Sequence, residues 1–300
     1  ADGDRISWIS NISRCCTHNY AGTYQMTIEQ LNKILLISLL LVCAIWLIIP
    51  FTMAVLWSLV DPSEPWTADK VLPPVISLYR WVDMWKNSSL KSALIASYTL
   101  APSAALLSLL LAMPTSFALG RLEFPGRELA KMLCLLPLVV PAFITAIFFT
   151  SLLYQVGLSS WRPGAILFAH AILFMPFAIR IMTVSFEQVR QDHIDAARNL
   201  GASHWARFRV AYLPALKPGI FATLLIVFIQ SIEEFAIAFI VGSPDIVTIP
   251  TLLYAALGQD YVRPNAAVLS LILVVPNVIL MLILERLLRS ANPTLSSGKG

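Results

Sequence analysis

Two adjacent acidic residues, Glu233 and Glu234, interrupt an otherwise apolar stretch at residues 218–242. On a helix that rises about 1.5 Å per residue they begin roughly 22 Å beyond Pro218, in the outer half of a hydrocarbon core about 30 Å thick. An ionised carboxylate at that depth is costly unless it faces water or a partner. Gln230, three or four residues earlier, extends a polar stripe beside either acid. We therefore expect at least one acid to line a solute pathway and to favour a cation; the alternative is that both bond to other helices or to a sister subunit.

The sequence lacks the residue sets of the common catalytic and metal sites. HExxH and GxSxG are absent, and the four histidines are scattered, with none paired to a carboxylate at metal-site spacing. A phosphate loop, G-x-x-x-x-G-K-S/T, is excluded because no two of the 12 glycines are separated by four residues. We expect no enzymatic activity, no metal and no cofactor, so any ATP that drives this chain must be hydrolysed by another subunit.

A polar, arginine-rich segment, "HIDAARNLGASHWARFRVAYLP", stands at residues 193–214 between two apolar stretches. Asp192 is placed to cap a short helix, which Gly201 can end because glycine tolerates a left-handed turn. Ser203 can begin a second helix, which we expect Pro214 and Pro218 to limit. Small and apolar residues beside the turn, with arginines around them, form a surface suited to a protein partner. These residues are Ala196, Ala197 and Leu200, with Arg198, Arg207 and Arg209.

The elements that must hold these residues are membrane helices. The chain is 58% hydrophobic and only 13% charged, against roughly 25% charged in ordinary soluble domains. Its apolar runs reach the ~20 residues that a membrane helix needs, provided that Arg180 lies at a membrane edge. We predict an all-α polytopic membrane protein with six transmembrane helices. They are expected at residues 34–60, 92–120, 132–161, 163–183, 218–242 and 264–284.

The distribution of cations predicts the orientation of these helices. With both termini inside, 15 of the 21 Lys and Arg residues fall on the cytoplasmic side, as cytoplasmic loops require. The net charge of +4 reflects this bias and not nucleic-acid binding. The expected layout is then a set of five regions. These are a cytoplasmic tail at 1–33, the first span at 34–60, an outer loop at 61–91, a membrane-spanning core at 92–287 with a cytoplasmic loop at 184–217, and a cytoplasmic tail at 288–300.

The outer loop carries its own helical pattern. Leu78, Trp81, Val82 and Trp85 recur at i, i+3, i+4 and i+7, which puts them on one helical face that suits either the lipid headgroup layer or the ends of the membrane helices. The four cysteines fall in the expected cytoplasmic tail or in membrane helices, where no disulfide framework is expected. They are Cys15, Cys16, Cys43 and Cys134.

The polar segment resembles a family signature. "DAARNLGASHWARFRVAYLP" is similar to the E-A-A-x-x-x-G-x9-I-x-L-P motif of the membrane subunits of binding-protein-dependent ABC importers. The matching positions are Asp195, Ala196, Ala197, Gly201, Leu213 and Pro214. Asp195 replaces the usual glutamate, and Ala211 replaces the usual isoleucine. The resemblance covers roughly residues 90–287, and "FIQSIEEFAIAFIVGSPDIVTIPTLLYAAL" looks most like the spermidine/putrescine-type permeases.

The resemblance implies a type I ABC importer permease fold in the bacterial inner membrane. In such importers the polar loop is the coupling helix, which docks into a cleft of a cytoplasmic ATPase subunit. The implied partners are a second permease subunit, two ATP-binding subunits and an external solute-binding protein. The first helix would be peripheral, and the other five would form the pathway, which alternates between inward-facing and outward-facing states.

Two other interpretations remain open at this point. A self-sufficient secondary transporter or channel would use Glu233 and Glu234 to couple proton or cation movement. A membrane scaffold would use the same cytoplasmic loop only for docking. The solute is also open: a polyamine is favoured by the resemblance together with the acidic pair.

Overall fold

The structure is a computed structural model that describes residues 3–67, 69–157, 160–258 and 263–291. The described residues contain no β-strand, only an isolated antiparallel bridge between Val60 and Ile76. The chain divides into two units, Ala1–Leu56 and Trp57–Gly300, which we describe separately. The all-α prediction is confirmed. The first unit is most of one helix, α1 (Gly3–Ser58), whose part from Gln30 onward is long and apolar enough to cross a membrane.

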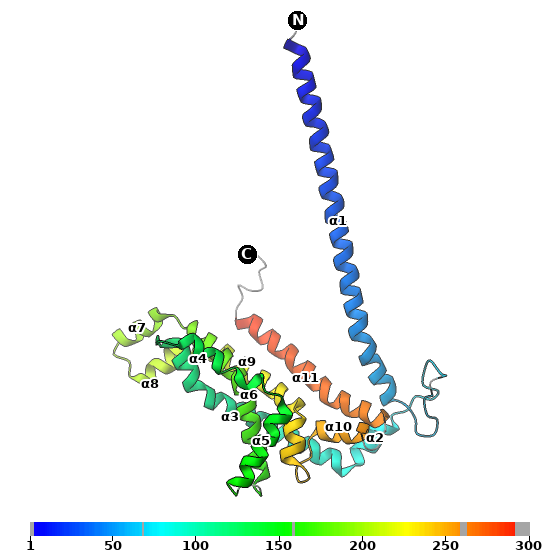
Figure 1. Ribbon diagram of the computed structural model, residues 1–300, viewed down its shortest axis with the longest axis vertical. Helices are drawn as coiled ribbons and strands as arrows, with labels where there is room; N and C mark the ends of the chain where they lie inside the picture. Colours follow the sequence, from blue (N-terminus) through cyan, green and yellow to red (C-terminus); the bar gives the residue numbers. More distant parts are fainter. Residues whose placement is uncertain (1–2, 68, 158–159, 259–262, 292–300) are drawn as a thin grey trace. The chain divides into compact units, whose positions relative to one another are not determined.

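The second unit is a bundle in which α3, α6 and α9 pack together (Figure 1). The bounds of its helices follow in chain order. They are α2 (Tyr79–Lys86), α3 (Ser88–Arg121), α4 (Arg127–Leu133), α5 (Ala142–Gln155), α6 (Arg162–Glu187), α7 (Gln191–Asn199), α8 (His204–Arg207), α9 (Leu213–Glu233), α10 (Ile249–Gly258) and α11 (Arg263–Ala291). Short 3₁₀ or π-helical turns lie at Leu136–Leu138, Phe208–Tyr212 and Ala238–Gly242.

Small residues allow the close packing of α3 against α6. A Cβ atom on Gly120 would come within 2.7 Å of the Phe186 Cβ atom and 2.9 Å of the Thr183 carbonyl oxygen, so only glycine fits there. The hydroxyls of Ser108 and Ser116 donate to α6 backbone carbonyls at 2.7 and 3.2 Å. Membrane helices associate in this way because lipid supplies no hydrophobic force between them, while small residues let backbones approach.

The described helices include five that are long and apolar enough to span a membrane, and a sixth if a bent pair is counted as one span. The bent pair corrects the predicted continuous helix at 132–161. Arg127–Leu138 and Ala142–Gln155 meet at 87°. Pro141 precedes the second part and is extended, with φ −55° and ψ 135°. Proline has no N–H for the helical ladder and disfavours helical geometry in the residue before it, which accounts for a break here.

The predicted span at 218–242 needs two corrections. Its helix ends at Glu233, where Glu234 takes an extended conformation with ψ 126°. At its other end the helix is continuous from His204, so Pro214 and Pro218 do not limit the preceding helix. The π-helical turn Phe208–Tyr212 lies just before Pro214, and within it the Leu213 N–H bonds to the Phe208 carbonyl five residues back. This wider turn lets the helix continue into Pro214.

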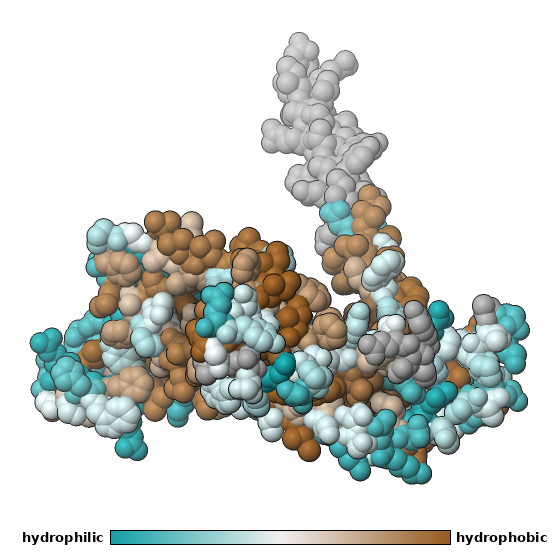
Figure 2. Space-filling view, turned by 60° about the horizontal axis from the view of Figure 1, so that its bottom comes forward, coloured by the Kyte–Doolittle hydropathy of each residue, from teal (hydrophilic) through white to brown (hydrophobic). Residues whose placement is uncertain are grey.

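The polar segment and the outer loop lie at opposite ends of the second unit. Figure 1 shows α7 and α8 at one end and α2 with α10 at the other. Hydrophobic side chains gather over the middle of this unit, and hydrophilic ones gather toward its ends (Figure 2). The arrangement suits a body that crosses a bilayer with one polar end on each side.

Helix α2 confirms that the outer loop contains a helix, and most of its predicted apolar face is not packed on the ends of the membrane helices. Met84 is buried and Trp81 is half-buried, whereas Leu78, Val82 and Trp85 stay exposed. In the C-terminal tail predicted at 288–300, α11 extends to Ala291, and residues 292–300 lie outside the described residues. Cys43 and Cys134 are free, while nothing is described of the Cys15 and Cys16 side chains.

Candidate functional site

The polar segment folds as two short helices joined by a tight turn. Gly201 has φ +73°, a left-handed conformation that glycine adopts at little cost. Across this turn the Ala202 N–H bonds to the Ala197 carbonyl at 3.1 Å, and the Gly201 N–H bonds to the Arg198 carbonyl at 3.0 Å. This pair of hydrogen bonds is a Schellman motif, which ends α7. The predicted turn at Gly201 is confirmed.

The helix starts in this segment are partly as predicted. Ser203 caps α8, because its hydroxyl accepts a hydrogen bond from the Ala206 N–H at 3.3 Å. Asp192 does not cap α7: the N-cap residue is Arg190, and Asp192 lies in the first turn, 2.9 Å from the Arg190 guanidinium. A carboxylate in the first turn still interacts favourably with the positive end of the helix. Asp195, one turn further on, accepts a hydrogen bond from Gln191 at 3.1 Å.

The segment has one face anchored in the bundle and one face free. Ile194 and Ala197 are buried, and Ile194 packs in a cluster with core residues of α6 and α9. On the other side, Ala196 is exposed, Leu200 is 88% exposed and Trp205 is 72% exposed. Large apolar side chains at such exposure indicate a surface that another protein or the lipid headgroup layer covers.

The predicted docking residues lie on two different helices of the structure. Asp195, Ala196, Ala197, Leu200 and Gly201 form α7 and its terminal turn. Leu213 and Pro214 lie apart from this turn, in the first turn of α9. The π-helical turn that joins the two places includes Ala211, which is buried in the same core cluster as Ile194.

Arg121, at the end of α3, braces the start of the segment. Its guanidinium donates to the Val189 carbonyl at 3.0 Å and to the Gln191 side chain, and it lies 5.9 Å from the Tyr212 ring centroid. One side chain therefore contacts the backbone two residues before α7, the first residue of α7 and the turn before α9. Movement of the segment must involve α3 as well.

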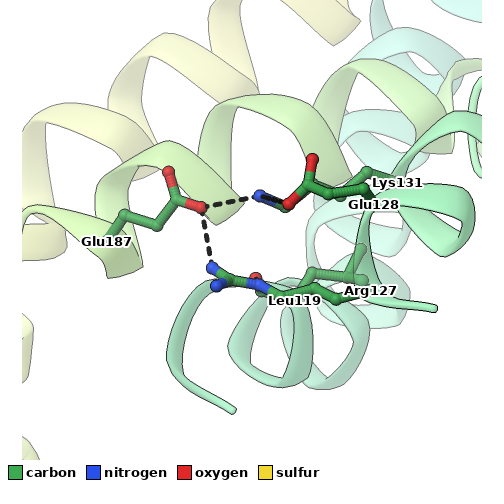
Figure 3. Close-up of polar contacts among 5 residues, drawn as sticks. All are labelled: Leu119, Arg127, Glu128, Lys131 and Glu187. Carbon is green, nitrogen blue, oxygen red and sulfur yellow. Dashed lines mark hydrogen bonds and ion pairs between the residues drawn. The ribbon is translucent and has the colours of Figure 1, made fainter. Parts of the chain in front are cut away.

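Glu187, the last residue of α6, lies at the centre of a group of ion pairs (Figure 3). Its carboxylate is 2.9 Å from the Arg127 guanidinium and 3.1 Å from the Lys131 ammonium. Lys131 also pairs with Glu128 at 2.9 Å, and Arg127 donates to the Leu119 carbonyl at 2.6 Å. These contacts fix α4, the start of the bent span, to the end of α6 just before the polar segment.

The acidic pair lies at the break after α9, where its two members have different surroundings. Glu234 is buried, and its carboxylate accepts hydrogen bonds from the Ile237 N–H at 2.9 Å and the Ala238 N–H at 3.1 Å. It therefore caps the helical turn that follows the break. The buried imidazole of His170 lies 3.4 Å from Glu234 and 2.8 Å from the Ser231 hydroxyl, which joins α6 to both sides of the break.

Glu233 is exposed in this subunit. Asn277 of α11 donates to its carboxylate at 2.8 Å. The Asn277 side chain is otherwise buried, and its Oδ1 atom has no hydrogen-bond partner among the described residues. Gln230 lies one turn earlier on α9 and is half-buried. A carboxylate and an amide oxygen at one place are groups that a cation or a hydrogen-bond donor can bind.

Sequence reasoning missed His170, Ser231, Asn277, Arg121 and Glu187. The signal for His170 and Asn277 was available, because a strongly polar side chain within an apolar span is unusual and needs a partner. Their pairing with particular acids was not available, since 64 residues separate His170 from Glu234 and 44 separate Asn277 from Glu233. Among the described residues, no group of three or more His, Cys, Asp or Glu side chains could hold a metal ion.

Residues 112–293 match the family described as the binding-protein-dependent transport system inner membrane component. Among curated relatives, the thiamine transport system permease protein ThiP of Escherichia coli is 29% identical over 71% of this chain. The chain covers only 42% of that relative's length. The molybdenum transport system permease protein ModB of Haemophilus influenzae is 31% identical over 69% of this chain and 97% of the relative.

Two solved structures share the fold. A chain of a bacterial ABC transporter involved in alginate import has a TM-score of 0.65 and 17% identity, covering 86% of this chain and 96% of that one. A chain of the MetNI methionine ABC transporter in an inward-facing conformation has a TM-score of 0.55 and 16% identity, covering 68% of this chain and 96% of that one. At this level of identity the likeness concerns the fold alone.

Proposed function

Because the chain belongs to the family of inner membrane components of binding-protein-dependent transport systems, we propose that it is a permease subunit of an ATP-driven ABC importer. The observation that carries this proposal is the position and exposure of the segment formed by α7 and α8. It stands at one polar end of the bundle, anchored by Ile194 and Ala197, and presents Leu200 and Trp205 to solvent. It also carries the family's motif residues, and Gly201 occupies the position where the turn requires a left-handed residue.

In this function the α7–α8 segment is the coupling helix. Leu200 and Trp205 would enter a cleft of a cytoplasmic ATPase subunit and bury their apolar surface there. When two ATPase subunits close on ATP, they would move two such segments together. Arg121 would transmit the motion to α3, and the Glu187 ion pairs would transmit it to α4 and so to the bent span. The pathway would alternate between inward-facing and outward-facing states by rigid-body movement of these helices.

We assign the pathway role to Glu233 and Gln230, and a structural role to Glu234. The Glu234 carboxylate is buried and bonded to two backbone N–H groups, so it has little capacity left for a solute. Glu233 is exposed at the break after α9, beside the unpartnered Asn277 Oδ1 atom. An exposed carboxylate within a membrane span is favourable only where water or a partner reaches it.

The solute is a small polar molecule, and the charge of Glu233 favours a cation. The relatives named above carry thiamine and molybdenum in their names, and a further one is a diacetylchitobiose permease of Streptomyces coelicolor, so family membership alone does not select a polyamine. The polyamine expectation came from the resemblance to spermidine/putrescine-type permeases together with the acidic pair. The relatives do not favour that group specifically, and we assign one of the two acids, Glu234, a structural role. We retain a polyamine as one candidate among organic cations.

The proposed assembly contains a second permease subunit, two ATP-binding subunits and an external solute-binding protein, in the bacterial inner membrane with both chain termini in the cytoplasm. In this assembly ATP hydrolysis is the task of the ATP-binding subunits and not of the permease. The broken span and the apolar sides of α5, which are exposed in this subunit, suit contact with a second permease subunit. They include Ile147 and Phe148.

The experiment is transport by the purified complex. The chain is co-expressed with the ATPase, permease and binding protein encoded beside it, and reconstituted in proteoliposomes. Uptake of the solute that the binding protein retains should require ATP on the ATPase side and the binding protein on the other side. Uptake that continues without ATP and is abolished by an ionophore would show a secondary transporter instead. A complex that binds its ATPase yet moves no solute would show a scaffold.

A further inference from the structure

A cavity of about 290 Å³ lies where α3, α4 and α6 meet, beside the ion pairs of Figure 3. Its apolar wall includes Leu135, Ile179 and Val184, and its polar wall includes Lys131, Arg180 and Thr183. We call it the α4–α6 cavity. At about 30 Å³ for each water-sized group it has room for roughly ten such groups. That is enough for a phosphate headgroup and the first carbons of an attached chain.

The charges around the α4–α6 cavity balance except for one. Glu187 is neutralised by Arg127 and Lys131, and Glu128 also pairs with Lys131. Two carboxylates thus face two cations. Arg180 is exposed, and among the described residues no ion pair or hydrogen bond engages its guanidinium. It therefore supplies the unbalanced positive charge of the cavity.

Thr183 gives a second and independent observation. It follows Arg180 by three residues on α6, so both side chains lie on one helical face. Its side chain lines the cavity, the residue is only 6% exposed, and its hydroxyl has no hydrogen-bond partner among the described residues. A buried hydroxyl normally has a partner, so this one indicates a ligand group that bonds to it.

We propose that the α4–α6 cavity binds an anionic phospholipid. The phosphate accepts hydrogen bonds from the Arg180 guanidinium and the Thr183 hydroxyl, and the first carbons of an acyl chain lie along Leu135, Ile179 and Val184. Guanidinium and phosphate match in geometry and charge. The position near the end of α6 is where a membrane helix passes from hydrocarbon to headgroups, which brings lipid phosphates within reach. The inference depends on membrane insertion and not on the transport proposal.

The bound lipid would also act on the bent span that begins with α4. It would lie against α6 a few residues before Glu187, whose ion pairs fix α4 to the end of that helix. Filling the cavity would oppose separation of α4 from α6. An anionic lipid would therefore favour one arrangement of the bent span over another.

Native mass spectrometry of the full-length chain in mild detergent tests the proposal, with phosphatidylglycerol or phosphatidylcholine titrated in. We expect one phosphatidylglycerol to bind about tenfold more tightly than phosphatidylcholine. Both lipids carry a phosphate, but the choline ammonium of phosphatidylcholine neutralises its headgroup, whereas phosphatidylglycerol keeps a net negative charge that pairs with the unbalanced charge of Arg180. Arg180→Gln should abolish this preference, and Arg180→Lys should keep part of it. Thr183→Val, which keeps the side-chain shape, should weaken binding about fivefold. Arg286→Gln, which removes an exposed cation near the end of α11, is the matched control and should change nothing.

Three results would overturn the proposal. An Arg180→Gln chain that keeps the full preference would show that the phosphate binds elsewhere. Equal binding of both lipids to the unaltered chain would show no anion site. Displacement of phosphatidylglycerol by excess inorganic phosphate would show that the site takes an anion from solution and not from the membrane. Thermal unfolding of each variant, measured in parallel, shows that loss of binding is not loss of fold.

Discussion

The imidazole of His170 lies 3.4 Å from the carboxylate of Glu234, and both side chains are buried where α9 ends. The other imidazole nitrogen contacts the Ser231 hydroxyl at 2.8 Å. The backbone hydrogen-bond ladder of α9 stops at Glu233, and this side-chain network connects the two sides of the break instead. Glu234 therefore has a structural role at the break after α9, which we call its framework role. The sequence alone could not distinguish it from Glu233 as a candidate pathway residue.

We predict that Glu234→Ala destabilises the subunit by about 1–3 kcal/mol, because two buried backbone N–H groups lose their acceptor and the buried His170 imidazole loses the carboxylate that lies 3.4 Å away. The thermal unfolding midpoint of the purified chain in detergent should fall. Glu233→Ala is the matched control, since its side chain is exposed, and it should leave the midpoint nearly unchanged. An unaltered midpoint in Glu234→Ala would contradict the framework role.

Glu233→Gln should lower uptake of a cationic solute about tenfold or more while the complex assembles normally, since a hydrogen bond to a charged group contributes about 1.5–3 kcal/mol. The substitution keeps the shape and the bond from Asn277 but removes the charge. Initial uptake rates in proteoliposomes, with ATPase subunit content measured on the same samples, provide the test. Normal cation uptake by this variant would remove Glu233 from the pathway.

Substitutions at Gly201 can show whether the position requires glycine for its left-handed backbone or for lack of room for a side chain. A Cβ atom there would meet nothing within 4 Å in this subunit, so any intrinsic cost of a side chain comes from the left-handed φ. That cost is roughly 1–2 kcal/mol for most residues but lower for asparagine. Gly201→Val should uncouple ATP hydrolysis from transport, and Gly201→Asn should be milder.

If Gly201→Asn and Gly201→Val uncouple transport equally, the ATPase cleft and not the turn requires glycine. Full solute-stimulated ATP hydrolysis in Gly201→Val would instead show that the turn has no coupling role. Both variants should insert in the membrane normally, which their yield in the membrane fraction measures.

The orientation of the chain is testable with cysteine reporters in a background that lacks the four native cysteines. Val71→Cys and Asp245→Cys should react with an impermeant thiol reagent added outside intact cells, whereas Pro125→Cys and Arg209→Cys should react only after lysis. The reason is the excess of Lys and Arg on the proposed cytoplasmic side. Labelling of residue 209 from outside would reverse the topology and exclude docking to a cytoplasmic ATPase.

The sequence was sufficient where the signal was local. The apolar runs predicted the long apolar helices, apart from the bend at Pro141 and the end of α9 at Glu233, and Gly201 and Ser203 predicted the turn and the cap that the structure contains. Asp192 was misplaced by two positions because Asp is favourable both as a cap and in the first turn. Local preference could not distinguish the two.

Where the outcome depends on distant partners, the sequence could not decide. Pro141 breaks its span, whereas Pro218 is accommodated within α9, although each proline lies in an apolar run. The two adjacent glutamates acquire different roles because His170 of α6 reaches one and Asn277 of α11 reaches the other. Such pairings form only when the helices pack.

Cross-linking from Leu200 tests the central claim most directly. In the assembled complex, Leu200→Cys carrying a short photoreactive group should cross-link to the ATPase subunit, with a yield that changes between ATP-bound and nucleotide-free states. Leu78→Cys, at a leucine that is also exposed but lies at the opposite end of the bundle, is the control and should give no ATPase adduct. An ATPase adduct from residue 200 is the predicted result. No adduct from residue 200 in a complex that contains the ATPase, or an equal adduct from residue 78, would contradict the account.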